Sequence, residues 1–332
     1  MPLNWGILGA GDIADRHVAP AMQAARGQRL VAVMRRDRRQ AEEFAQRHGA
    51  ARAYTNTEAL VNDPEVTAIY VATPPHLHAA NTILAAENGK HVLCEKPMAK
   101  DVNQARAMIQ ACRANNVRLT ICYYQRFNVR HHRIKQLVDS GAIGQVMAAR
   151  MQFLDYRPPR PGDWRQNPEI SGGGPLMDLG PHCLDLLRYF CGPPVEYEAM
   201  VDSAVCGMPV EDTATLLLRM TNGAQAVICT HWSIANFAPE RLNRVELYGT
   251  KGSIFAYPIY SKDSSGTVEC ITADGAQNFE IPPGGPRPHV GLLEAFDEAV
   301  SSGGPVASPG EEGLADIELL QNCRSRLKEC HR

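Results

Sequence analysis

Three side chains in this sequence have the types and spacing that proton transfer and charge stabilisation require. His182 could act as an acid or a base because an imidazole titrates near neutral pH, and Asp178 stands four residues before it. On a continuous helix that spacing places both side chains on one face. Lys96 lies between Glu95 and Pro97, and its ammonium could stabilise an alkoxide as the charge develops. Oxidation of an alcohol carbon needs an acid/base and a nearby cation, so Lys96, Asp178 and His182 are the predicted catalytic residues and substrate contacts.

Each of these residues also has a structural interpretation. Most lysines are solvated surface charges, and an isolated helical histidine is more often a hydrogen-bonded core residue. Three glycines at 172–174 favour a functional His182, because residues without a Cβ let a ligand approach the backbone closely. Asp185, three residues after His182, could hold its ring. Pro181 has no N–H, so a helix at this point should kink or begin later.

The start of the chain carries a glycine turn of the type that binds phosphate. The apolar residues 5–8 are followed by Gly9-Ala10-Gly11 and then by a helical pattern that includes Ala14. Gly9 permits the tight turn, Gly11 lets a pyrophosphate approach, and Ala14 lets helix and strand pack closely. The phosphate would lie on unpaired N–H groups at the helix start. The alternative is an ordinary strand–helix turn without a ligand. The predicted dinucleotide contacts here are Gly9, Gly11, Asp12 and Ile13.

The residues after the second predicted strand bear on the choice of nucleotide. In dinucleotide-binding folds that prefer NAD, an acidic residue about 20 residues past the glycines binds the ribose 2′-hydroxyl. Here Arg35 and Arg36 follow the apolar residues 30–34, and Asp37 is displaced. A guanidinium suits a 2′-phosphate through its charge and its planar set of donors. The sequence therefore predicts NADP, with NAD as the alternative if the two arginines are only the basic start of a helix.

The predicted elements divide this α/β chain into two domains. In residues 1–123, apolar runs alternate with helical patterns, which predicts a dinucleotide-binding Rossmann domain with a doubly wound parallel sheet. Ligands of such sheets lie beyond the carboxyl ends of the strands, where Gly9, Arg35, Thr73 and Lys96 fall. In residues 124–332, several strand-like runs follow one another, which predicts a substrate-binding α+β domain with a large, mostly antiparallel open sheet. Such a sheet leaves one face uncovered, so we expect a homodimer or homotetramer through that face.

Individual helices and strands of the second domain are also predicted. A strand is expected over residues 195–205. Helices are expected over residues 129–139, 176–190, 290–300 and 311–328.

The composition excludes several other classes of protein. The formal net charge is −2 over 332 residues, without a basic block or an acidic tail, so no nucleic-acid partner is indicated. The sequence shows no signal peptide and no apolar stretch that could span a bilayer, so we expect a cytoplasmic protein without a membrane partner. His76 and His78 lack a nearby Cys or acid cluster, so no metal site is predicted.

The ten cysteines are scattered and form no Cys-x-x-Cys pair, which indicates reduced thiols. They are Cys94, Cys112, Cys122, Cys183, Cys191, Cys206, Cys229, Cys270, Cys323 and Cys330.

Three stretches of the sequence together resemble one family of enzymes. They are the glycine turn, the segment 89–97 that ends in Glu95-Lys96-Pro97, and the segment from the glycines at 172–174 through His182 to Asp185. In this order and spacing they resemble the glucose–fructose oxidoreductase, inositol dehydrogenase and rhizopine-catabolism (Gfo/Idh/MocA) family, over nearly the whole chain. The resemblance implies a nicotinamide-binding domain, then a domain whose open sheet carries substrate contacts and usually the dimer interface. The implied reaction is hydride transfer between NADP or NAD and a sugar, cyclitol or related polyol.

The resemblance also implies roles for individual residues. Lys96 would stabilise the alkoxide with Glu95 as its orienting partner, and His182 would be the acid/base where some relatives carry a tyrosine. The loop beginning at Thr73 would border the adenine and ribose, and further loops would reach the nicotinamide. Tyr156, Arg160 and Trp164 would line a sugar pocket, or would only anchor their loop. Besides the glycine turn and the two arginines, the implied cofactor contacts are Thr73, Pro74, His76, His78, Glu95, Lys96, Gln125, Arg126, Trp164 and Arg165.

Two other functions fit the same motifs. Some relatives keep their nicotinamide bound and recycle it within one turnover, as sugar–sugar oxidoreductases and redox-assisted glycosidases do. A non-enzymatic regulator that senses the cofactor would keep the fold but would have no need of Lys96, Asp178 and His182.

Overall fold

A computed structural model describes residues 3–203, 208–235, 237, 242–261 and 264–325 of the chain. Its contacts divide the chain into two compact units. The first unit contains Met1–Tyr123 and His289–Glu318, and the second contains Tyr124–Pro288 and Leu319–Arg332. Of the helices that the structure describes, none combines the length and the apolar character needed to cross a bilayer.

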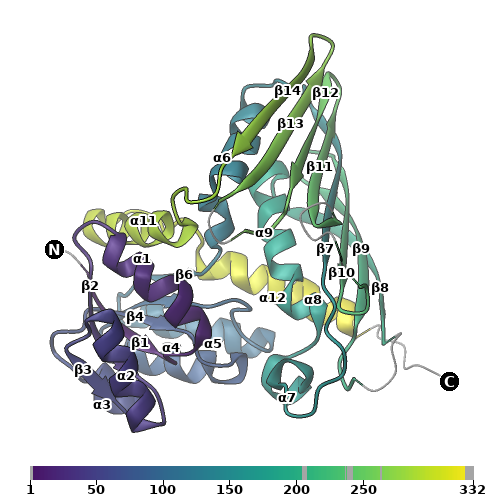
Figure 1. The fold of residues 1–332 in the computed structure, drawn as a ribbon. Coiled ribbons are helices and arrows are strands. Elements are labelled where there is room, and N and C mark those ends of the chain that lie inside the picture. The colour runs from purple at the N-terminus through teal and green to yellow at the C-terminus, as the bar shows by residue number, and fades with distance from the viewer. Residues whose placement is uncertain (1–2, 204–207, 236, 238–241, 262–263, 326–332) are drawn as a thin grey trace. The chain divides into compact units, whose positions relative to one another are not determined.

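The first unit is built on a six-stranded parallel sheet in the order β3-β2-β1-β4-β5-β6. Figure 1 labels these strands except β5. The order reverses between β1 and β4, which is the switch point at which doubly wound sheets bind ligands. This confirms the predicted Rossmann arrangement. The strands are β1 (Asn4–Leu8), β2 (Arg29–Met34), β3 (Arg52–Tyr54), β4 (Ala68–Val71), β5 (His91–Cys94) and β6 (Leu119–Ile121).

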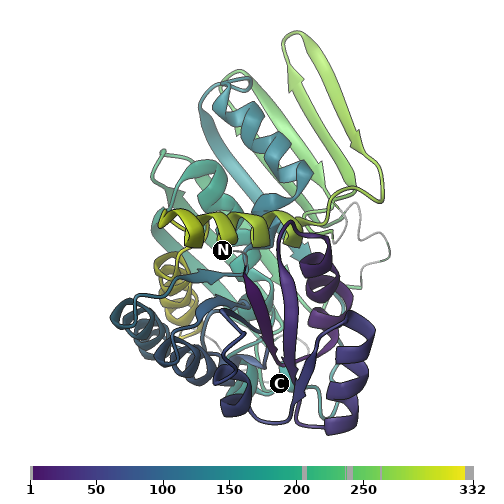
Figure 2. The same ribbon diagram turned by 90° about the vertical axis from the view of Figure 1, so that its left-hand side faces the viewer.

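Helices flank this sheet on both faces, as Figure 2 shows. Asp37 and Asp101 accept backbone N–H bonds at two helix starts, and Gly49 ends a helix at φ 70°. The helices are η1 (Ala14–Val18, a π-helical turn), α1 (Ala19–Ala24), α2 (Arg38–His48), α3 (Thr57–Val61), η2 (Pro75–Leu77), α4 (His78–Glu87), α5 (Val102–Ala114), α11 (Pro288–Ser302) and the first part of α12 (Gly310–Arg324).

The segment 289–318 packs with the first unit, although the sequence placed it in the second domain. Three contacts within the first unit account for this. The rings of Trp5 and Phe296 lie 5.7 Å apart between centroids. The Thr120 hydroxyl donates to the Ser308 carbonyl over 2.9 Å, and the Tyr123 hydroxyl donates to Asp316 over 2.6 Å.

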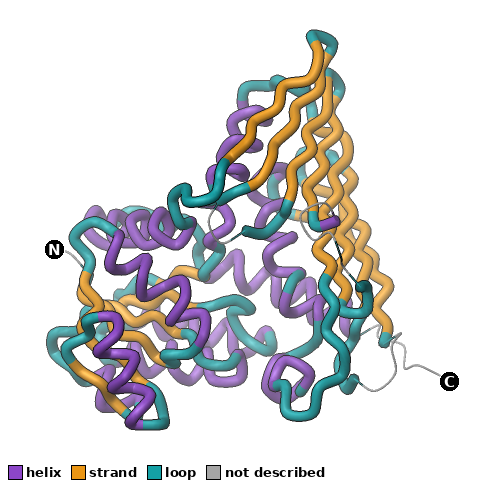
Figure 3. Tube along the Cα trace, viewed as in Figure 1, coloured by secondary structure: helices purple, strands orange, loops and turns teal. Residues whose placement is uncertain are grey.

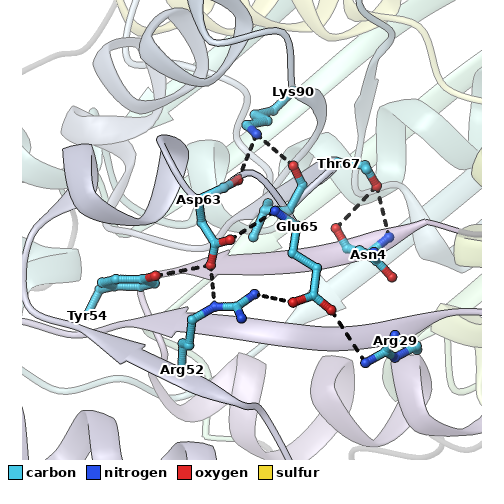
Figure 4. A network of polar contacts seen from close by, with 9 residues as sticks. Asn4, Arg29, Arg52, Tyr54, Asp63, Glu65, Thr67 and Lys90 are labelled. Carbon is cyan, nitrogen blue, oxygen red and sulfur yellow. Dashed lines mark hydrogen bonds and ion pairs between the residues drawn. The ribbon is translucent and has the colours of Figure 1, made fainter.

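A polar network joins the amino ends of the parallel strands, opposite the edge where ligands are expected (Figure 4). Buried Asp63 accepts from Arg52 Nε over 2.5 Å, from the Tyr54 hydroxyl over 3.1 Å and from the Glu65 backbone N–H over 3.0 Å. Lys90 Nζ, just before β5, donates to the carbonyl of Asp63 over 2.9 Å. Burial raises the pKa of Asp63, but these hydrogen bonds and the Arg52 charge outweigh burial and lower it overall.

Replacing Asp63 by asparagine is expected to lower the free energy of unfolding by about 1.5–3 kcal/mol, the usual worth of a hydrogen bond to a charged group. Because the folded state lowers this pKa, the stabilisation is present above the unfolded carboxyl pKa and is lost as pH falls through the folded one. Urea unfolding followed by circular dichroism measures both effects. The control is Glu65→Gln, which removes a more exposed carboxylate and should change stability by less than about 1 kcal/mol. If both variants lose the same free energy of unfolding, Asp63 is not the main stabilising carboxylate of this network.

The second unit is built on an eight-stranded sheet in the order β14-β13-β12-β11-β7-β10-β9-β8. The pair β7–β10 is parallel, and the other neighbouring pairs of the described strands are antiparallel. This confirms the predicted mostly antiparallel sheet. The strands are β7 (Val146–Leu154), β8 (Pro194–Asp202), β9 (Thr213–Met220), β10 (Gln225–His231), β11 (Arg244–Gly249), β12 (Gly252–Tyr257), β13 (Gly266–Thr272) and β14 (Gly275–Ile281).

Helices α6, α8 and α9 lie along one face of this sheet, and the described residues place no helix of the unit on the other face (Figure 3). Met200 and Leu217 are exposed on strands β8 and β9. The helices are η3 (Tyr124–Phe127), α6 (Val129–Asp139), η4 (Trp164–Gln166), α7 (Pro168–Ser171), α8 (Pro175–Asp178), α9 (Gly180–Cys191) and the end of α12.

Some predicted features fall partly outside the described residues. These are the end of the strand over 195–205, the end of the helix over 311–328, and Cys206 and Cys330. The eight described cysteines are free thiols.

Candidate active site

The glycine turn after β1 has the shape that a dinucleotide requires. Gly9 has φ +92°, and a Cβ there would lie 2.7 Å from the Ala72 carbonyl oxygen and from the Thr73 nitrogen, so only glycine fits without strain. At Gly11 an added Cβ would meet only the Gly9 oxygen, at 3.9 Å, so the backbone is open to a ligand. The helix begins directly afterwards at Asp12 and Ile13. These residues therefore fit a diphosphate.

The two arginines after β2 differ in their contacts. Arg35 donates through NH1 to the Ala10 carbonyl over 2.9 Å and so braces the glycine turn. Asp37 is the N-cap of α2 and accepts from the Gln40 backbone N–H over 2.8 Å. Arg36 is exposed. Burial, and then the charges of Lys100 and Arg36, lower the pKa of His76.

The loop from Thr73 to His78 is held from within the first unit. His78 is 1% exposed, its Nε2 lies 2.7 Å from the Thr73 carbonyl oxygen, and its Nδ1 lies 2.9 Å from the Pro97 carbonyl oxygen. Burial lowers the pKa of His78 to about 4. The ring thus lies between two loops of the first unit and braces them, and because a neutral imidazole has a single N–H it donates to one of the two carbonyls. Its predicted cofactor contact stays a prediction. Thr73 and His76 stay partly exposed, as does Pro74.

Lys96 lies at the carboxyl end of β5, on the same sheet edge as the glycine turn, and its side chain is partly exposed. Glu95 before it is buried. The Glu95 carboxylate accepts from the Tyr70 hydroxyl and, over 3.1 Å, from the Lys96 backbone N–H. Burial raises the pKa of Glu95, although the Lys96 charge and the Tyr70 bond oppose this. Glu95 therefore holds the backbone that carries Lys96.

The predicted single helix over residues 176–190 is two helices in the structure. Helix α8 ends at Asp178 and α9 starts at Gly180 with Pro181 in its first turn, where a missing N–H costs no bond. The same-face relation of Asp178 and His182 assumed a continuous helix, and the break at Leu179 removes that basis. His182 lies in the first turn of α9 and is 3% exposed.

Three aromatic rings surround His182 within the second unit. The ring centroid of His182 lies 5.7 Å from Tyr124, 5.8 Å from Tyr260 and 6.3 Å from Phe153. Tyr124 directly precedes the predicted contacts Gln125 and Arg126, whereas no motif indicates Tyr260 and Phe153, which come from the loop after β12 and from β7. An aromatic ring presents an apolar face, which suits the C–H face of a sugar ring.

Asp185, which the sequence offered as a partner of the His182 ring, pairs with Arg126. It is 1% exposed and accepts from Arg126 Nε over 2.8 Å and from Arg126 NH2 over 2.6 Å. This buried pair ties η3 to α9 and gives Arg126 a positioning role, while its predicted cofactor contact stays a prediction. Gln125 beside it is 1% exposed, and among the described residues neither its Oε1 nor its Nε2 has a hydrogen-bond partner. A buried amide in this state is a candidate ligand contact.

The glycines at 172–174 serve packing and not ligand approach. A Cβ at Gly174 would collide with the Glu211 carbonyl oxygen, and one at Gly173 would lie 2.8 Å from Arg324 Nε. Buried Glu211 accepts from the Gly174 N–H over 2.8 Å and from Arg324 Nε over 3.1 Å. The space left by these glycines is therefore filled by the second unit's own chain.

The loop after β7 is braced by its own residues. The Arg160 N–H donates to Gln166 Oε1 over 2.8 Å, and the Arg165 guanidinium lies 4.3 Å from the Trp164 ring centroid. Tyr156 is 57% exposed. These contacts show that the loop's residues anchor the loop itself. Their predicted contacts with a sugar and with the cofactor stay predictions.

Comparisons with known proteins identify the family. Residues 3–123 match the model of the oxidoreductase family with an NAD-binding Rossmann fold, and residues 131–255 match that of the GFO/IDH/MocA C-terminal domain. The 1,5-anhydro-D-fructose reductase of Ensifer adhaerens is 32% identical over 313 residues, which cover 94% of this chain and 92% of that protein. The chain belongs to the GFO/IDH/MocA family. It is therefore an oxidoreductase, a dehydrogenase or reductase with an NAD-binding domain, as the sequence predicted.

Further members of the family extend the comparison. Oxidoreductase P35 of Formosa agariphila is 38% identical over 195 residues, 57% of this chain, and the match spans 61% of that protein's length. The crystal structure of an aldose-aldose oxidoreductase from Caulobacter crescentus, complexed with glycerol, has a TM-score of 0.89 and 28% identity, and covers 98% of this chain and 97% of that one.

Proposed function

We propose that this oxidoreductase transfers hydride between NADP and a hydroxyl or carbonyl group of a sugar, cyclitol or related polyol. The observation that carries the proposal is the position of Lys96 at the carboxyl edge of the sheet whose first turn, at Gly9, fits a diphosphate. A bound nicotinamide would supply the hydride donor or acceptor. Sugar substrates are favoured because the similar proteins include an anhydrofructose reductase and an aldose-aldose oxidoreductase.

Two side chains of the protein are proposed to act on the substrate oxygen, one on its charge and one on its proton. Lys96 stabilises the negative charge on that oxygen, and His182 removes or returns its proton. Asp178 stands before the helix break and is proposed to contact the substrate. The Gln125 amide, buried without a partner among the described residues, is proposed to bind the cofactor's amide or the substrate.

NADP is favoured over NAD by the charges beside the glycine turn. Arg36 carries a positive charge where an enzyme that prefers NAD would place an acid, and the Asp37 carboxylate next to it caps α2. We expect Arg36→Ala to lower kcat/KM for NADP about 10–100-fold, the worth of a charge-assisted hydrogen bond, with little change for NAD. Arg38→Ala, which removes an exposed arginine paired with Glu42, is the control. A wild-type preference for NAD would overturn the assignment.

The proposed reaction is tested with a panel of aldoses, cyclitols and keto-sugars, each with oxidised or reduced nucleotide of both kinds. Absorbance of the reduced nicotinamide gives the rates. Turnover of a member of the panel supports the proposal, and no turnover of any member with either nucleotide contradicts it.

A second candidate is an enzyme that keeps its nicotinamide and reduces one sugar while oxidising another. The similarity to an aldose-aldose oxidoreductase favours it. Nucleotide that stays with the protein through gel filtration, together with sugar conversion but no net change in nicotinamide absorbance, would support this reading over the first.

The uncovered face of the eight-stranded sheet is proposed to join two or four copies of the chain. Met200 and Leu217 expose 73% and 58% of their surface there, so this face offers apolar side chains to a partner copy. Light scattering at micromolar concentration should give a dimer or tetramer mass, and a monomer mass would count against this.

A further inference from the structure

Three buried side chains with metal-ligating atoms meet at the carboxyl edge of the six-stranded sheet. Glu95 follows β5, Cys122 follows β6, and His289 lies in the first turn of α11, and all three belong to the first unit. One ligand atom from each lies within 4.8 Å of the others. The three residues are 8%, 0% and 2% exposed.

We propose that Glu95, Cys122 and His289 form a binding site for one divalent cation of the zinc type. A thiolate, an imidazole and a carboxylate are the ligands that Zn²⁺ takes in proteins, and three protein ligands leave the fourth tetrahedral position for water. With bonds of about 2.0–2.3 Å, tetrahedral ligand atoms lie roughly 3.5 Å apart. Side-chain movements of about 1 Å therefore close the present arrangement around an ion.

The charges of this site balance when the cation is bound. The cation brings two positive charges, and the Cys122 thiolate and the Glu95 carboxylate bring two negative ones, so the filled site is neutral. A neutral group is much less costly to bury than an isolated charge. Binding releases the Cys122 thiol proton to solvent, and a second proton when Glu95 is protonated.

Neighbouring side chains contact two of the three ligands, Glu95 and His289. The Tyr70 hydroxyl donates to Glu95, as the outer partners of metal ligands commonly do. The ring of His17 stacks on that of His289 with centroids 6.0 Å apart and planes 14° from parallel. His17 comes from the π-helical turn η1 directly after the glycine turn, and such turns are frequent at functional sites.

A cation at this site would also draw the Glu95 carboxylate toward it and away from the Lys96 backbone. Inhibition of the oxidoreductase by zinc is therefore expected, and this consequence alone rests on the proposed function. Binding of the cation does not.

The test is a Cd²⁺ titration of the metal-free full-length protein, followed by thiolate-to-cadmium absorption in the ultraviolet. The wild type should show this band with one equivalent, and Zn²⁺ should displace it. Cys122→Ser should lose the band, and His289→Gln should weaken binding at least about tenfold, the loss seen even for outer partners. The control is Cys112→Ser, which changes a buried thiol of α5 in the same unit and should keep the band.

Several results would overturn the proposal. They are the absence of the band in the wild type, its persistence in Cys122→Ser, or its equal loss in Cys112→Ser. If Cys122→Ser fails to fold by circular dichroism, His289→Gln decides, because unchanged affinity in that variant also refutes the site.

Discussion

Lys96→Met is expected to lower kcat/KM by about 10²–10³-fold, the usual effect of removing one group that stabilises a developing oxyanion. Methionine keeps the unbranched apolar stem and removes the ammonium. The backbone at residue 96 is held independently by the Glu95 carboxylate, which accepts from its N–H over 3.1 Å, so the loop should keep its shape. Steady-state kinetics with the best substrate of the panel measures the effect, and thermal unfolding checks the fold.

The same strand offers a matched control. Lys90 precedes β5 as Lys96 follows it, and its Nζ donates to the carbonyls of Asp63 and Val66 over 2.9 and 2.7 Å. Lys90→Met should therefore lower the unfolding temperature while leaving kcat/KM within a few-fold. If the two variants lose activity equally, Lys96 has only a structural role.

His182→Asn is expected to lower kcat/KM by about 10²–10⁴-fold, the range for loss of a general acid or base. The variant should also lose the pH dependence that a titrating imidazole imposes on kcat/KM. If His182 has only a structural role, the variant should be less stable, and its remaining activity should keep the wild-type pH profile. His132→Asn on α6 of the same unit is the control, and it should leave the rate unchanged.

Combining the two changes tests whether Lys96 and His182 serve one reaction. Residues that act together have non-additive effects, so Lys96→Met with His182→Asn should cost about as much as the worse single variant. Fully additive losses would mean that the two groups contribute to separate steps or that one acts through stability.

Short sequence patterns were sufficient to predict most strands and helices of the fold. Apolar runs ending in glycine or proline marked β1, β4 and β5, since each strand is buried on both faces. Short elements without such a run were missed, namely β3 (Arg52–Tyr54) and α3 (Thr57–Val61), because three to five residues carry too little periodicity. The sequence showed two closing helices but could not show that Phe296 packs against Trp5.

In the candidate site, too, the sequence could indicate some residues and contacts, while others depend on tertiary packing. Gly9 and Lys96 were found because strand ends in a parallel sheet share an edge, and that rule needs no knowledge of tertiary contacts. Asp185 pairs with Arg126, which lies 59 residues away, and no local spacing in the sequence could indicate that pair. The glycines at 172–174 suggested room for a ligand, but Glu211 and Arg324 occupy that room. The cluster at Cys122 and His289 is likewise created by folding alone.

The nucleotide-binding unit is discontinuous along the chain, since it needs residues 289–318 as well as the first 123. A fragment cut after Tyr123 would leave Trp5 without Phe296 and the Tyr123 hydroxyl without Asp316. Chimaeras that exchange cofactor preference between family members should therefore carry the distant segment along with the amino-terminal half. Swapping at the single boundary after residue 123 would pair a sheet from one parent with a covering helix from the other.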